Sequence, residues 1–224
     1  MAFLSSSQLA ISNTATAAVP VPSGAAADDV AVVGLYIEST TAVTPPSGFT
    51  QKDSDTTNAG TEGGLRVYWK RLTGADSGTW DFTFSTSWAG AAAVLHRGRI
   101  TTGDPFDGTN IARSTATVST SPAVAVTPAE ASGDAVWFAT DFSGGNTWTP
   151  PGSYTERQDN DVITVATRDA ISAGATGNIT GTLNVAGYSK AWLGVVRVPA
   201  TGPAIVRPTA ADALAGYRRG RRHH

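Results

Sequence analysis

His96 is the one histidine inside the chain, because the other two are the final residues, His223 and His224. A hydrolytic triad needs a nucleophile, a histidine base and an acid that orients the base. His96 ends an apolar run that is typical of a strand, and the chain contains no Gly-x-Ser-x-Gly elbow that would present a serine. It also contains no cysteine, which excludes a thiol nucleophile and a thiolate zinc site. We therefore expect His96 to be structural, and no catalytic residue is predicted.

The carboxylates occur in segments that are typical of turns. Asp104 and Asp107 lie in Gly-Asp-Pro-Phe-Asp-Gly, where turn chemistry accounts for them better than the carboxylate pair of a glycosidase does. The segment Asp53–Glu62 offers oxygen ligands for calcium but departs from EF-hand spacing, and Asp159–Asp161 is a second acidic turn. Gly74–Gly78 lacks the lysine of a phosphate-binding loop. The sequence therefore predicts a protein without enzymatic activity, metal or cofactor.

Two of the six tryptophans are candidates for binding. Trp88 and Trp148 lie close to glycine or proline in expected loops, whereas the other four fall in expected strands. A tryptophan in a loop can stack on the face of a sugar or fill a protein interface. The alternative is that each ring packs beneath its own loop. We name Trp88 and Trp148 as candidate ligand or interface aromatics.

The C-terminal segment differs from the rest of the chain. Residues 209–212 resemble a helix N-cap, so a short helix is expected up to Tyr217. A cluster of basic residues follows, and with Tyr217 it supplies the candidate partner contacts: Arg218, Arg219, Arg221 and Arg222. These four arginines carry +4, so the remainder of the chain carries about −6 of the net −2. An acidic protein surface is favoured over nucleic acid as their partner, and a frayed, solvated tail is the alternative.

The composition points to strands and to neither a membrane nor an export signal. Charged residues make up 15% of the 224 residues, against roughly 25% in typical globular domains. Thr, Ser and Gly fill the polar quota and suit strands and turns. No apolar run approaches the roughly 20 residues of a membrane span. The N-terminus lacks the positive charge that opens a signal peptide.

The chain repeats itself. An apolar strand led by Asp29 is followed by Thr44-Pro45-Pro46, and at a constant offset of 105 residues the same order recurs from Asp134 to Thr149-Pro150-Pro151. Further on, Arg71 matches Arg168 at an offset of 97. The repeat predicts two copies of one strand-and-turn scheme that pack face to face, since neither sheet buries its apolar side alone.

Strand periodicity agrees with this scheme. Trp80, Phe82 and Phe84 alternate with polar residues, while Val30–Ile37, residues 136–142 and residues 191–198 are apolar throughout, as in central strands. The predicted fold is all-β: a jelly-roll-like antiparallel β-sandwich built from two similar half-repeats, with a short C-terminal helix or tail. The predicted organisation is an N-terminal arm (1–9), a first β repeat (10–100), a second β repeat (101–200), and a linker with a basic tail (201–224).

Several of these segments together resemble a family of proteins. They include the Pro-Pro-Ser-Gly-Phe turn (Pro45–Phe49), Arg66–Arg71, Trp80–Phe84 and the Ala93–Gly98 strand. In these patterns the chain is similar to minor virion structural proteins of tailed bacteriophages of actinobacteria.

The resemblance implies a non-enzymatic component of the virion, made in the bacterial host and docked in multiple copies as a minor tail or capsid-surface decoration protein. Its expected partners are other virion proteins and further copies of itself. The alternative is a carbohydrate-binding or host-adhesion module on the same fold. In that case the partner is a host-surface glycan, bound by Trp88 and Trp148 or by the acidic loops with calcium.

Overall fold

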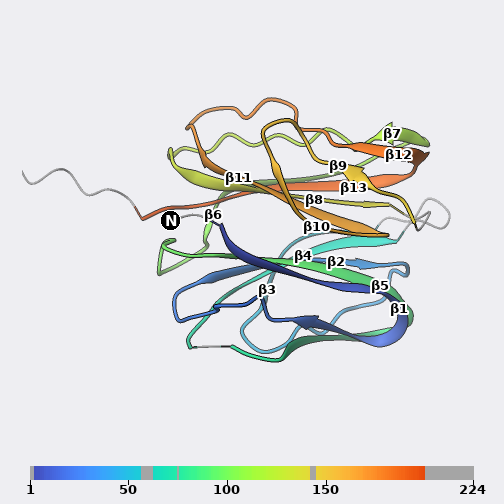
Figure 1. The fold of residues 1–224 in the computed structure, drawn as a ribbon, viewed down its shortest axis with the longest axis horizontal. Coiled ribbons are helices and arrows are strands. Elements are labelled where there is room, and N and C mark those ends of the chain that lie inside the picture. The colour runs from blue at the N-terminus through green and yellow to red at the C-terminus, as the bar shows by residue number, and fades with distance from the viewer. Residues whose placement is uncertain (1–2, 57–62, 75, 142–144, 200–224) are drawn as a thin grey trace, which may run out of the picture.

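The computed structural model describes residues 3–56, 63–74, 76–141 and 145–199, and these residues form thirteen strands and no helix (Figure 1). The strands form three antiparallel sheets. The all-β antiparallel sandwich predicted from the sequence is thus confirmed. The predicted C-terminal helix and the candidate contacts Tyr217, Arg218, Arg219, Arg221 and Arg222 lie outside the described residues.

The first sheet has the order β1-β5-β2-β4-β3. Its strands are β1 (Phe3–Pro20), β2 (Val30–Ile37), β3 (Thr50–Asp55), β4 (Gly64–Arg71) and β5 (Thr79–His96). The second sheet has the order β10-β11-β8-β13-β6. Its strands are β6 (Phe106–Arg113), β8 (Gly133–Asp141), β10 (Thr155–Asn160), β11 (Ile163–Ile171) and β13 (Ser189–Val196). A small third sheet, β7-β12-β9, consists of β7 (Val118–Thr120), β12 (Thr182–Gly187) and β9 (Trp148–Thr149).

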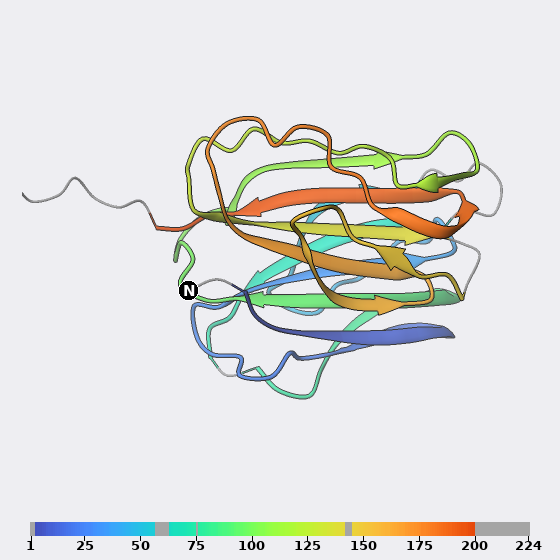
Figure 2. The same cartoon turned by 45° about the horizontal axis from the view of Figure 1, so that its top comes forward.

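The two large sheets lie face to face, and each is covered on its outer side as well (Figures 1 and 2). Alternate residues of a strand point to opposite faces. In β2, Val30, Val32 and Tyr36 therefore enter the core between the sheets, whereas Val33 and Leu35 enter an outer core. Burial on both faces explains why β2 is apolar at every position, as the sequence predicted for a central strand.

The two large sheets have the same strand order, with β6, β13, β8, β11 and β10 in the places of β1, β5, β2, β4 and β3. Opposite edges face each other, since β3 lies against β6 and β1 lies against β10. At the centre, a Cβ added to Gly34 of β2 would lie 2.5 Å from Phe138 of β8, so glycine makes room for this ring. The repeats are therefore related by an approximate two-fold axis parallel to β2 and β8.

The proline turns of the two repeats share one geometry. The amide of Phe49 donates to the carbonyl of Pro46 at 3.2 Å, and the amide of Tyr154 donates to that of Pro151 at 3.0 Å. The residue before each aromatic has a positive φ, 85° at Gly48 and 71° at Ser153. These positions keep the offset of 105 residues that the sequence shows.

The central strands depart from that offset by one residue. Asp28 and Ser132 both have a positive φ. The amide of Asp28 donates to the carbonyl of Leu72, the residue after β4, and the amide of Ser132 donates to that of Ile171, the last residue of β11. The equivalent of Asp29 is therefore Gly133, and Asp134 lies one position further into its strand. Because side chains alternate between the faces, this shift turns Asp134 into the space between the sheets.

The described residues include no helix that is long and apolar enough to cross a membrane. Residues 3–9 of the predicted N-terminal arm belong to β1, where they pair with the C-terminal half of β5.

Candidate functional site

A buried charged cluster joins the two sheets at the end where β2 and β8 begin. His96 Nδ1 lies 2.9 Å from Asp134 Oδ2, and the guanidinium of Arg99 lies 2.7 Å from the same oxygen. The three side chains are at most 2% exposed. Burial lowers the pKa of Arg99, and the Asp134 carboxylate opposes that shift. A histidine that is closed off from solvent does not reach a substrate, so the structure places His96 among the groups that hold the repeats together.

A second ion pair stabilises the start of the segment between β5 and β6, which connects the two repeats. Arg97 donates from Nε and from one terminal nitrogen to the two carboxylate oxygens of Asp29, at 2.9 and 2.8 Å. Asp29 also accepts the amide of Ala26 at 2.9 Å. The hydrogen bonds from Arg97 satisfy both oxygens of a carboxylate that is almost fully buried.

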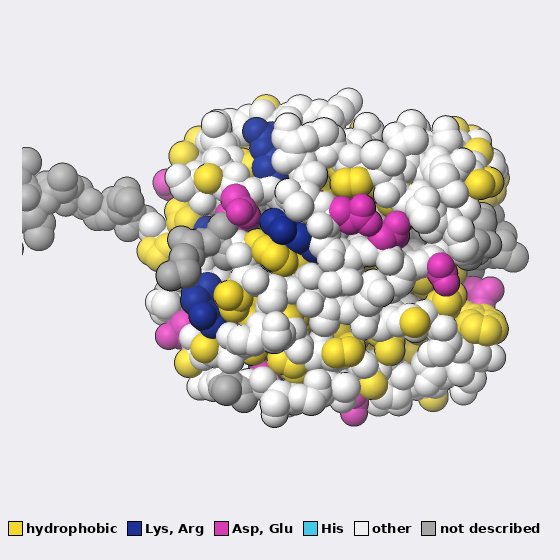
Figure 3. Space-filling model, in the orientation of Figure 1, with side chains coloured by type: hydrophobic (Ala, Val, Ile, Leu, Met, Phe, Trp, Pro, Cys, Tyr) yellow, Lys and Arg dark blue, Asp and Glu magenta, His cyan; other side chains and the backbone are white. Residues whose placement is uncertain are grey.

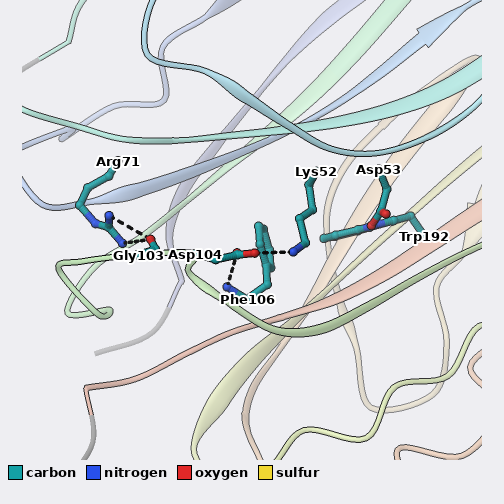
Figure 4. Close-up of polar contacts among 7 residues, drawn as sticks. All are labelled: Lys52, Asp53, Arg71, Gly103, Asp104, Phe106 and Trp192. Atoms are coloured by element: carbon teal, nitrogen blue, oxygen red, sulfur yellow. Dashed lines mark hydrogen bonds and ion pairs between the residues drawn. The ribbon is translucent and has the colours of Figure 1, made fainter.

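The rest of the connecting segment is tied to β3 and β4 (Figure 4). Asp104 pairs with Lys52 at 2.5 Å, and its other oxygen accepts the amide of Phe106 at 3.0 Å. Arg71 donates to the carbonyl of Gly103 at 3.3 Å. Asp104 therefore forms a turn and an ion pair, the role that the sequence favoured over a glycosidase carboxylate. Asp107, the other carboxylate of that segment, accepts the amide of Glu130 at 2.8 Å.

The acidic residues predicted to lie in loops are in part strand residues, because Asp53 and Asp55 belong to β3 and Asp159 belongs to β10. Asp53 accepts a hydrogen bond of 2.6 Å from Trp192 Nε1 (Figure 4), and Asp55 lies 3.4 Å from the buried Lys190. In the second acidic turn Asp159 accepts the amide of Trp148 at 3.0 Å. Burial raises the pKa of Asp159, and the neighbouring Asp161 adds to the shift. Among the described residues, no group of three or more His, Cys, Asp or Glu side chains is placed to hold a metal ion. Residues 57–62, in the first predicted acidic loop, lie outside the described residues.

The two candidate tryptophans differ in their surroundings. Trp148 is 4% exposed, and its ring packs edge-on against Trp137 with 5.8 Å between the centroids. It belongs to the outer core of the second sheet and offers no free ring face to a ligand. Trp88 lies in β5 and is 46% exposed, so it alone of the two has a ring that is open to a partner.

Trp88 is one of four large hydrophobic residues that the described structure leaves exposed; the others are Val118, Val185 and Tyr188. The sequence reasoning did not select these three. For Tyr188 the sequence holds a signal, because this aromatic residue directly follows Gly187, and Trp88 likewise lies within two residues of a glycine.

All four residues lie at one end of the molecule, which we call the distal end. The residue after Trp88 pairs with Ile37, the last of β2, and the residue after Tyr188 pairs with Asp141, the last of β8. Val118 pairs with Gly187, and Val185 is in the same strand, β12. Since β2 and β8 run parallel, their last residues share an end. In Figure 3 the distal end is on the right, and hydrophobic side chains are visible along that edge.

The described chain begins and ends at the opposite end. Phe3 pairs with His96, and Val196, the last residue of β13, pairs with Asp134. Figure 1 shows both of these chain ends on the left.

A pocket of about 250 Å³ opens at the distal end, between the end of β6 and strand β7. Its lining includes Arg113, Ser114, Val118 and Thr120, of which Val118 is one of the exposed hydrophobic residues. Hydroxyl groups, one cation and exposed apolar side chains thus occur together at this end.

In comparisons with known proteins, no family model, curated protein or solved structure matches the chain. What the protein does is therefore inferred from its own residues and geometry.

Proposed function

We propose that the protein is a non-enzymatic structural component of a tailed-phage virion, docked in multiple copies on the particle as a minor tail or capsid-surface protein. One observation carries the proposal: the four exposed large hydrophobic residues gather at the distal end, away from both ends of the described chain. Apolar side chains that are clustered on a soluble surface are typical of a site for protein contact. The resemblance of the sequence to minor virion proteins points the same way.

The buried charges support a structural role. His96, Arg99 and Asp134 are closed off from solvent and connect one repeat to the other. Lys52 and Asp104 fasten the segment that connects the repeats. These contacts join the two sheets to each other, which suits a protein that is held at fixed positions on a particle.

The test is a count of copies per particle by quantitative mass spectrometry. We expect the wild-type protein at a fixed stoichiometry, and a large reduction for the variant Trp88→Ser/Tyr188→Ser with its circular dichroism spectrum unchanged. The control is Thr101→Ala, an exposed position at the opposite end, which should be incorporated normally. Absence of the wild-type protein from purified particles, or full incorporation of the double variant, would contradict the proposal.

The basic C-terminal segment needs its own variant. Deletion of residues 203–224 should leave the sandwich folded and lower incorporation, because the arginines are proposed to contact an acidic protein surface. Normal incorporation of this truncation would remove the tail from the proposed contacts and leave the distal end as the docking surface.

The exposed ring of Trp88 favours a second candidate function, a carbohydrate-binding or host-adhesion module. A glycan array, probed with and without a chelator, tests it. Binding that is lost in Trp88→Ala supports glycan recognition by this ring. Binding that persists in Trp88→Ala but is lost with the chelator assigns glycan recognition to bound calcium. Absence of any binding by the wild-type protein argues against this function.

A further inference from the structure

The loops Leu72–Trp80 and Ile171–Ile179 occupy equivalent places in the two repeats. The first residue of each loop accepts a backbone hydrogen bond of 2.8 Å through its carbonyl. Leu72 accepts it from the amide of Asp28, and Ile171 accepts it from the amide of Ser132. Each loop ends at a residue that pairs with a buried valine, since Trp80 pairs with Val19 and Ile179 with Val124. The two loops therefore have the same length and correspond at an offset of 99 residues.

Glycines within the loops confirm this alignment. Gly78 has a φ of 76°, and Gly177, which lies 99 residues later, has a φ of 69°. By the same offset Ala175 stands in the place of Asp76, and Ile179 in the place of Trp80.

In the first repeat, the side chains of Trp80 and Asp76 fill the space beside Phe49, and the charge of Asp76 is balanced by that of Lys70. The ring of Trp80 packs edge-on against Phe49 with 5.2 Å between the centroids, and its Nε1 donates to Asp76 at 2.8 Å. Asp76 also pairs with Lys70 at 2.6 Å. Burial acts to raise the pKa of Asp76, but the hydrogen bonds from Lys70 and Trp80 lower it overall. An indole and a carboxylate thus occupy the space beside Phe49 and Lys70.

The second repeat keeps an aromatic and a basic residue in the places of Phe49 and Lys70, but it has no counterpart of the indole and the carboxylate. Tyr154 takes the place of Phe49. Arg168 takes the place of Lys70, because Arg168 pairs with Ala135 and Lys70 pairs with the equivalent Ala31. The match of Arg168 with Arg71 that the sequence suggested is therefore wrong by one residue. Ile179 and Ala175 replace the indole and the carboxylate.

A pocket of about 140 Å³ opens where the indole and the carboxylate are missing, and its lining includes Tyr154, Arg168, Ile171, Ala175 and Ile179. The exposed guanidinium of Arg168 makes no hydrogen bond or ion pair with another side chain or carbonyl of the described ranges. The pocket therefore combines an apolar wall with a guanidinium that lacks a counter-charge.

We propose that this pocket binds a small aromatic carboxylate. The carboxylate pairs with the guanidinium of Arg168, whose planar fork matches it in two hydrogen bonds. The aromatic ring occupies the space that Trp80 fills in the first repeat and packs against Tyr154 and Ile179. The site is separate from the distal end, so it goes beyond the proposed role of the protein in a particle.

Indole-2-carboxylate is the probe that matches the first repeat most closely, because it places a carboxylate beside the ring N–H, as Asp76 lies beside Nε1 of Trp80. Isothermal titration calorimetry should show saturable binding of one molecule. Backbone amide shifts in NMR spectra should change in residues 172–176. The neutral analogue indole-2-carboxamide should bind at least about tenfold more weakly, since it removes a charge-assisted pair.

Matched variants separate this site from its counterpart. Arg168→Gln should weaken binding of indole-2-carboxylate by about tenfold or more, while Lys70→Gln, the same change in the first repeat, should leave it unaltered. Ala175→Asp/Ile179→Trp places the residues of the first repeat in the pocket and should abolish binding. If that double variant folds poorly, Ala175→Asp alone, at an exposed position, should still weaken binding by giving Arg168 a partner.

No saturable binding by the wild-type protein would overturn the proposal, as would unchanged affinity in Arg168→Gln or in a folded double variant. These measurements use the isolated protein. Their outcome is therefore independent of whether the protein is incorporated into particles.

Discussion

Replacement of Asp134 by asparagine tests whether the buried charges hold the repeats together. The carboxylate lies 2.9 Å from His96 Nδ1 and 2.7 Å from the guanidinium of Arg99. The Asp134→Asn variant would keep nearly the same side-chain shape and remove the negative charge. The Arg99 side chain, which is 2% exposed, would then remain buried with the Asp134 counter-charge removed.

The expected loss follows from that burial. Removal of one partner from a buried ion pair lowers the free energy of unfolding by about 3–5 kcal/mol. The pair of Lys52 with Asp104 is the internal comparison, because the Asp104 side chain is 50% exposed. Pairs at the surface contribute about 0–1 kcal/mol. Asp134→Asn should therefore destabilise the protein by roughly 3 kcal/mol more than Asp104→Asn does.

Urea unfolding followed by tryptophan fluorescence measures this difference. Linear extrapolation gives the free energy of unfolding and the m-value, and an unchanged m-value shows that the unfolding transition itself is the same. In thermal unfolding the difference corresponds to about 2–4 °C in Tm for each kcal/mol in a chain of this size.

A rescue variant addresses the origin of the loss. Asp134→Leu/Arg99→Met removes both charges and should recover stability relative to Asp134→Asn, since a packed apolar pair replaces an unpaired charge. A loss below about 1 kcal/mol for Asp134→Asn, equal to that of Asp104→Asn, would refute the reasoning that the cluster is desolvated and paired.

Three other features give separate expectations. Gly34→Val should destabilise the protein by about 1–3 kcal/mol, because the added Cβ lies 2.5 Å from Phe138, and Gly34→Val/Phe138→Leu should recover part of the loss in urea unfolding. Trp148→Ala should lower the free energy of unfolding by about 3–5 kcal/mol, whereas Trp88→Ala should change it by about 0.5 kcal/mol or less; equal losses would contradict the burial of Trp148. Burial raises the pKa of Tyr154 to about 12, so the folded state keeps a proton that the unfolded chain releases near pH 10. Stability should fall between about pH 10 and 12, and Tyr154→Phe should flatten the decline in alkaline urea unfolding.

Local patterns were sufficient to predict the strands. The apolar run Val30–Ile37 coincides with β2, and the alternation at Trp80, Phe82 and Phe84 reappears as alternate burial along the start of β5. These predictions succeeded because side-chain alternation along a strand is a property of the strand itself. The proline turns were predictable for the same reason, since Pro46 to Phe49 close on each other within four residues.

The site residues depended on contacts that the sequence does not display. Trp148 stands two residues before a proline in the sequence, yet its ring is buried and packs against Trp137 from another strand. Trp88 stands in a comparable sequence context and remains exposed. Nothing local separates the two, because the exposure of a ring is set by what the rest of the chain places over it.

The all-β class, the central strands and the existence of a second copy follow from the sequence alone, because each is written in alternation, turn residues and spacing. Which face a residue occupies, and what it meets there, depends on the folded chain. A shift of one residue places Asp134 between the sheets, against His96 and Arg99, where Asp29 had been its apparent equivalent. The pleat reverses direction at every residue, so an alignment that is correct for the turns can be out of phase for the strand between them.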